Sequence, residues 1–134
     1  MSRDIDNIKT NISLIIKGEV TENHFNNLNF LSKVGKIRFR SKGETISRVV
    51  PPLDTNVFTF TFDLHNESDM FNFISIINEL NLDKLKENND VKLRIFLQSN
   101  NAQVYLPLSR NVIQAIANLN IDMEISILSW GECE

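Results

Sequence analysis

In Val57-Phe58-Thr59-Phe60-Thr61-Phe62-Asp63-Leu64, apolar and polar side chains alternate from Phe58 onward. The phenylalanines fall on one side and the threonines on the other, which is the period of a strand with one buried face. We expect this run to be the central strand of a sheet. In residues 70–85, apolar side chains recur at the spacing of one helical face, so we expect a helix that covers the phenylalanine side of the strand.

Alternating apolar residues predict further strands on both sides of this unit. Strands are expected over residues 11–17, 36–42, 91–97, 103–108 and 121–128. Helices are expected to begin near Thr21 and Ser109, because such side chains accept hydrogen bonds from the free N–H groups at a helix start. Pro107 places the strand over residues 103–108 at a sheet edge, since proline lacks the N–H that an inner ladder needs.

The predicted order of elements is strand, helix, strand, strand, helix, strand, strand, helix, strand. Direct strand-to-strand links in such an order indicate an α+β fold, with a mainly antiparallel sheet and helices packed on one face. The first six elements match the βαββαβ plan of ferredoxin-like folds, and the rest form an added β-α-β segment. This topological match carries no function by itself.

The length and composition of the chain indicate one ordinary globular domain spanning residues 1–134. Within it we expect a frayed lead-in over residues 1–10 and a short tail over residues 130–134. With 42% hydrophobic and 23% charged residues, the chain has enough apolar side chains for a core. The sequence contains no apolar run near the roughly 18 residues of a membrane span and no visible secretory signal. We therefore expect a cytoplasmic protein of bacterial type without a membrane partner.

The residues that usually carry catalysis or hold cofactors are sparse. Cys133 is the only cysteine, and His24 and His65 are far apart, so we expect no disulfide, no metal site and no cofactor. None of the four glycines belongs to a phosphate-binding fingerprint. The sequence has no Gly-x-Ser-x-Gly elbow for a serine nucleophile, which favours a protein that is not an enzyme.

The positive charges of residues 36–42 form the first candidate binding site. A strand here places Lys36, Arg38, Arg40 and Lys42 on one face. Such a row contacts a nucleic-acid backbone in some proteins. In others it lies on an edge strand and prevents aggregation of one sheet with another. Because no exposed aromatic residues are expected between these charges for base stacking, binding of single-stranded RNA is the less favoured alternative.

The second candidate group lies at the exit of the predicted central strand. Asp63, His65 and Glu67 occupy a position where sheets often present functional side chains, although polar loop residues are also common there. Trp130 is a further candidate, because tryptophan near a terminus either caps the core or anchors an interface.

Several segments, taken together, resemble a bacterial family known as domain of unknown function four-two-seven-nine. They are residues 11–16 with Gly18-Glu19, the helix start at Thr21, Ser41-Lys42-Gly43-Glu44 and Leu119-Asn120-Ile121-Asp122-Met123-Glu124-Ile125. The resemblance extends over about residues 11–129, and the Lys42-Gly43-Glu44 turn is its most specific element. It implies a small cytosolic protein without an assigned reaction, similar in some members to antitoxin or immunity components. Phe58 and Phe60 stand where the family pattern has a tryptophan.

These observations support three functional hypotheses. The first is a non-enzymatic protein-binding module, most concretely an immunity-type protein that binds and neutralises a toxin domain with 1:1 stoichiometry. The alternative is a small enzyme or ligand-binding domain with a pocket near His65 and the strand over residues 36–42. The third is nucleic-acid binding through that basic strand.

Overall fold

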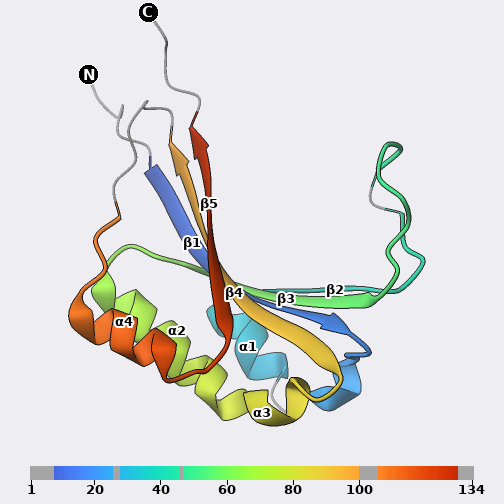
Figure 1. Ribbon diagram of the computed structural model, residues 1–134, viewed down its shortest axis with the longest axis horizontal. Coiled ribbons are helices and arrows are strands. Elements are labelled where there is room, and N and C mark those ends of the chain that lie inside the picture. The colour runs from blue at the N-terminus through green and yellow to red at the C-terminus, as the bar shows by residue number, and fades with distance from the viewer. Residues whose placement is uncertain (1–7, 26–27, 46, 100–105, 130–134) are drawn as a thin grey trace, which may run out of the picture.

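The chain folds into a five-stranded sheet with its helices packed against one face (Figure 1). The computed structural model describes residues 8–25, 28–45, 47–99 and 106–129. Its elements are β1 (Ile8–Gly18), the 3-10 turn η2 (Glu22–His24), α1 (Leu28–Val34), β2 (Lys36–Arg40), β3 (Asn56–Asp63), α2 (Glu67–Ile77), the 3-10 turn η3 (Asn78–Leu80), α3 (Leu82–Leu85), β4 (Asn89–Ser99), α4 (Arg110–Ala117) and β5 (Asp122–Ser129).

The strands lie in the order β2-β3-β1-β4-β5, and β4–β5 is the parallel pair in an otherwise antiparallel sheet. The prediction of an α+β fold with a mainly antiparallel sheet and helices on one face is therefore confirmed. The prediction that β3 is the central strand is wrong, because β1 occupies the middle. The sequence of β1 contains the unbroken apolar run Leu14-Ile15-Ile16, and all three side chains are buried. Such a run is typical of a strand that is buried on both faces.

The helix face of the sheet forms the hydrophobic core. Phe58 and Phe60 of β3 are fully buried there, as the alternation predicted. Phe73 of α2 stacks on Phe60, whereas Phe58 packs against Phe25 and Phe39. The helical segment does not continue unbroken through residue 85. Asn81 adopts a left-handed backbone conformation with φ 53°, so the chain turns between η3 and α3.

The region after β4 differs from the prediction. Residues 100–105 lie outside the described part of the chain, and residues 106–108 do not form a strand. Pro107 removes a backbone donor, and Ser109 then caps α4 by accepting a hydrogen bond from the Val112 N–H. The chain thus leaves β4, passes through α4 beside α2, and returns as β5 parallel to β4. The added segment contributes one described strand instead of two.

Candidate functional site

One face of the sheet is covered by none of the described helices, and we call it the uncovered face (Figure 1). Its side chains occupy the alternate positions of each strand, opposite those that build the core. Its cations are Lys9, Lys17, Lys36, Arg38, Arg40, Lys92 and Arg94, and its acids are Asp63, Asp90, Asp122 and Glu124. The cations outnumber the acids, although the whole chain has a net charge of −3. The uncovered face is therefore positive on an acidic protein.

The middle of the uncovered face is neutral. Ile15 of β1 is buried there, between Thr59 of β3 and Lys92 of β4 in the sheet register. The aliphatic stem of a lysine covers apolar neighbours while its ammonium group stays in water. Ser13 and Thr61 form a hydrogen bond of 2.8 Å across β1 and β3. Lys9 and Lys17 lie near the two ends of β1, and most of the other charges lie on the strands to either side of this neutral middle.

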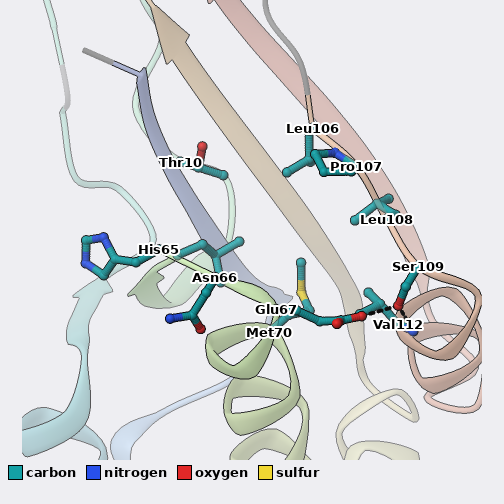
Figure 2. A pocket seen from close by; sticks show the side chains of 11 residues that line it. Thr10, His65, Asn66, Glu67, Met70, Leu106, Pro107, Leu108, Ser109 and Val112 are labelled. Carbon is teal, nitrogen blue, oxygen red and sulfur yellow. Dashed lines mark hydrogen bonds between the residues drawn. The ribbon is translucent and has the colours of Figure 1, made fainter. Parts of the chain in front are cut away.

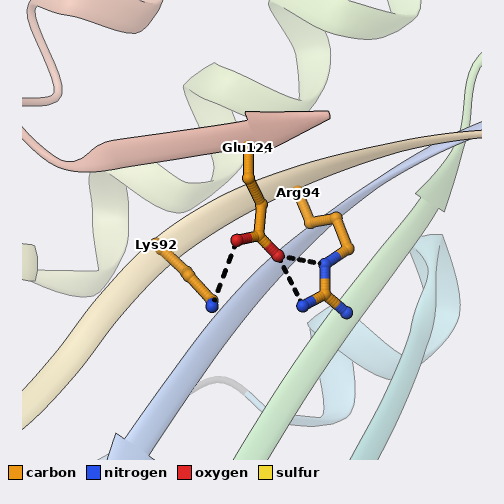
Figure 3. A network of polar contacts seen from close by, with 3 residues as sticks. All are labelled: Lys92, Arg94 and Glu124. Carbon is orange, nitrogen blue, oxygen red and sulfur yellow. Dashed lines mark hydrogen bonds and ion pairs between the residues drawn. The ribbon is translucent and has the colours of Figure 1, made fainter. Parts of the chain in front are cut away.

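On one side of the face, Glu124 joins β5 to β4 through two cations (Figure 3). Its carboxylate accepts hydrogen bonds from the Arg94 guanidinium and from Lys92 Nζ, the latter at 3.3 Å. The hydrogen bond from Arg94 is the main cause that holds the pKa of Glu124 below its usual value. Burial opposes this shift, and Lys92 reinforces it. Two cations share one carboxylate, so this cluster keeps an excess of positive charge.

On the opposite side, β2 presents the cations that the sequence predicted. Lys36 and Arg38 are exposed and form no ion pair with the described residues, while Arg40 binds Glu44 at 2.8 Å. Lys42 departs from the prediction, because β2 ends at Arg40. It lies in the following turn, where its backbone N–H donates to Asn56 Oδ1 at 2.8 Å.

A long connection between β2 and β3 projects from the sheet on the side opposite the helices, and its described residues are 41–45 and 47–55 (Figure 1). We call it the projecting loop. Its base is closed by hydrogen bonds from the Gly43 N–H to the Leu53 carbonyl and from the Leu53 N–H to the Glu44 carbonyl, at 2.7 and 2.9 Å. At its tip, Val49 is 90% exposed. The loop thus presents an apolar tip next to the positive side of the uncovered face.

Three of the predicted site residues lie around one small hollow. Lys36, Asp63 and His65 line a space of about 190 Å³ together with Asp69. The Asp69 carboxylate is already engaged, since its Oδ2 accepts a hydrogen bond of 2.7 Å from the His65 backbone N–H. Ligand sites usually enclose about 300–1,000 Å³. Lys36 of the basic strand and His65 thus line one space, but that space is small.

A larger pocket of about 310 Å³ lies between the beginnings of α2 and α4 (Figure 2). Met70, Leu106 and Val112 are among its apolar lining residues, and the His65 ring points away from them. Glu67 accepts a hydrogen bond from the Ser109 hydroxyl, which is itself the N-cap of α4. A negative charge is favoured at a helix N-terminus, so Glu67 already supplies the anion that this position attracts. Sequence reasoning did not anticipate this link between two helices.

Other predicted features have different outcomes. Trp130 lies outside the described residues. Within the described part, no group of three or more histidine, cysteine or acidic side chains is placed to hold a metal ion. The described helices include none that is long and apolar enough to span a membrane. The uncovered-face cations Lys92 and Arg94 were missed, although their alternation with Leu93 and Ile95 places them outward.

A scan against protein-family models, a search of curated proteins and a search of solved structures each find no match to this chain. The function must therefore be argued from the surface of the molecule itself.

Proposed function

We propose that this protein is a non-enzymatic protein-binding module and that it binds an acidic partner through the uncovered face. The excess of cations on this face, on a chain of net charge −3, is the observation that carries the proposal. Complementary charge accelerates association and orients the partner before contact. Lys36 and Arg38 are the main candidates for this role, because neither forms an ion pair with a described residue.

The projecting loop supplies the second part of the interface. Charged contacts at a rim contribute mainly to the association rate, whereas apolar side chains that become desolvated contribute more to affinity. Val49 and Val50 are exposed at the tip of the loop, and hydrogen bonds at the base limit its motion. A partner that contacts both the basic strand and this tip is held by charge and by burial of apolar area.

The most concrete form of the proposal is a bacterial, cytoplasmic immunity-type protein that neutralises a toxin domain as a 1:1 complex. The resemblance of Lys42-Gly43-Glu44 and the flanking segments to a family with immunity-like members motivates this form. We also infer a ferredoxin-like core. The order β2-β3-β1-β4, with helices in the β1–β2 and β3–β4 connections, supports it, and α4 and β5 then extend that core.

The proposal is tested by affinity capture from native cells with a matched pair of charge-reversal variants. The face variant is Lys36→Glu with Arg38→Glu, and the control is Lys33→Glu with Lys84→Glu, on exposed positions of α1 and α3. Both variants change the net charge equally. We expect the wild type and the control to retain one stoichiometric partner, and the face variant to lose it. Equal retention by both variants, or recovery of the bait alone, would contradict the proposal.

Nucleic-acid binding through the same face is the second candidate. Phe96 of β4 is part-exposed on this face beside Arg94, and an aromatic ring near cations is a platform for base stacking. Asp63, Asp90 and Asp122 lie on the same face and repel phosphates, so we rank this candidate second. An affinity for single-stranded RNA that falls steeply with salt, and that Lys36→Glu with Arg38→Glu abolishes, would favour it.

A further inference from the structure

The two edges of the sheet differ in a way that points to a second interface. The β2 edge carries Lys36, Arg38 and Arg40 at alternate positions, and charges of this kind prevent one sheet from pairing with another. The β5 edge carries no such charge near its end, because residues 125–129 are Ile-Ser-Ile-Leu-Ser. The β2 edge is protected against strand pairing along its length, whereas the end of the β5 edge is not.

The end of β5 is apolar on both faces of the sheet. Ile125 and Ile127 are in register with Ile95 and Leu97 of β4, so they lie on the helix face, yet 48% and 60% of their surfaces are exposed. Leu128 lies on the uncovered face and is 48% exposed. Among the described strands, only β4 pairs with β5. The other edge of β5 therefore offers a pairing template flanked by exposed apolar side chains.

We propose that β5 pairs antiparallel with β5 of a second copy of this chain, about a two-fold axis near Ser126. A two-fold interface brings the same surface of both copies together, so this surface must be complementary to itself. Pairing centred on Ser126 places Ile125 of one copy opposite Ile127 of the other, on the same face. These isoleucines become cross-strand neighbours, and the two sheets join into one.

The charges of β5 permit this contact. With Ser126 opposite Ser126, Glu124 faces Leu128, so no two acids lie directly opposite each other. The Glu124 carboxylate is moreover held over β4 by Lys92 and Arg94, away from the free edge (Figure 3). An acidic partner has no cation to contact along residues 125–129, whereas a second copy offers apolar side chains in register.

This dimer goes beyond the proposed binding function and does not depend on it. The cations Lys36 and Arg38 lie on β2, and β2 and β5 are the opposite edges of the sheet. Dimerisation through β5 therefore leaves the basic strand free. Loss of one interface is expected to leave the other intact.

The first test measures the mass of the full chain by sedimentation equilibrium over a wide range of concentrations. We expect the wild type to approach twice its 15.4 kDa monomer mass. Ile127→Lys, which places a charge at the free edge, is expected to sediment as a monomer with an unchanged circular dichroism spectrum. Ile113→Lys is the matched control, because Ile113 is a half-exposed isoleucine on α4, and it is expected to leave the dimer intact. A monomeric wild type, or equal dimerisation of both variants, would overturn the proposal.

A second test reports on the register and does not rely on a destabilising substitution. In a Cys133→Ser background, Ser126→Cys places two thiols opposite each other across the axis. Facing residues of antiparallel strands have Cα atoms about 4.5–5.5 Å apart, a separation that a disulfide spans. We expect Ser126→Cys to form a covalent dimer upon mild oxidation, and Ser32→Cys on exposed α1 to remain monomeric under the same conditions. Absence of the Ser126→Cys disulfide would overturn the proposed pairing.

Discussion

The ring of Phe60 stacks on the ring of Phe73, with centroids 5.6 Å apart and planes inclined by 8°. This contact joins β3 to α2, and neither side chain is exposed to solvent. Stacked aromatic pairs stabilise a fold by more than the burial of their apolar area alone accounts for. The contact fixes the helix over the sheet and so leaves the opposite face free of that helix.

Phe73→Ala is expected to lower the free energy of unfolding by about 3–5 kcal/mol, because the cavity left in the core collapses only partly. Urea unfolding followed by circular dichroism measures the change. Phe71→Ala is the matched control on the same helix, since Phe71 is 38% exposed, and we expect a clearly smaller loss. Equal losses for the two variants would contradict the central position of Phe73 in the core.

Asn66→Ala is expected to destabilise the fold by about 0.5–2 kcal/mol. The Asn66 side chain caps α2 by accepting a hydrogen bond of 3.0 Å from the Asp69 N–H. Thermal unfolding monitors the loss, and Asn66→Asp should retain most of the stability because aspartate also caps a helix. Asn72→Ala, at an exposed position inside the same helix, is the control and should not destabilise. A wild-type melting temperature for Asn66→Ala would argue against the cap.

The pH dependence of stability is expected to contain a contribution from Glu124. Its pKa is lowered in the folded protein, mainly by the Arg94 hydrogen bond, so its carboxylate stabilises the fold above the pKa of the unfolded chain. This contribution is lost as the pH falls through the lowered pKa. Glu124→Gln should therefore show a shallower decrease in melting temperature on acidification.

Arg94→Gln provides the complementary measurement for this prediction. Removing the donor removes the main cause of the lowered pKa of Glu124. The decrease in melting temperature on acidification should therefore become shallower in Arg94→Gln too. Melting curves of the three proteins, recorded from neutral pH downward at low ionic strength, give the comparison. Identical slopes for all three would show that the Glu124 cluster makes no pH-dependent contribution.

Gly18→Ala is expected to destabilise the protein through backbone strain. Gly18 has φ 151°, and an added Cβ would lie 2.6 Å from Asn89 Oδ1 and 2.7 Å from the Asn88 carbonyl. Strain of this kind costs about 1–3 kcal/mol. Urea unfolding of Gly18→Ala and of Lys17→Ala, an exposed neighbour in β1, separates strain from the general effect of a substitution at this strand end.

Local pattern predicted the parts of the fold that depend on neighbours in sequence. The alternation around Phe58 and Phe60 correctly identified β3, its buried side and the helix that covers that side. The order of strands was less accessible, because pairing of β1 with both β3 and β4 depends on contacts between distant segments. The strand predicted over residues 103–108 shows a further limit, since Leu106 and Leu108 alternate with Pro107 yet lie in the lead-in to α4.

The same distinction applies to the candidate site. The row Lys36, Arg38 and Arg40 was visible in the sequence because one strand carries it. The Glu124 cluster was not, because the parallel register of β4 and β5 decides which side chains meet across thirty residues of sequence. The excess of positive charge on the uncovered face appears only when both strands are placed in one sheet.

The middle position of β1 has a consequence for synthesis on the ribosome. Of the five described strands, β1 emerges first from the exit tunnel, yet both of its neighbours, β3 and β4, are translated later. Until then the run Leu14-Ile15-Ile16 has no partner strand on either side, and long-range pairing of this kind is slow. Among the described strands, β1 therefore waits longest for its two partner strands, and its buried run stays unpaired during that time.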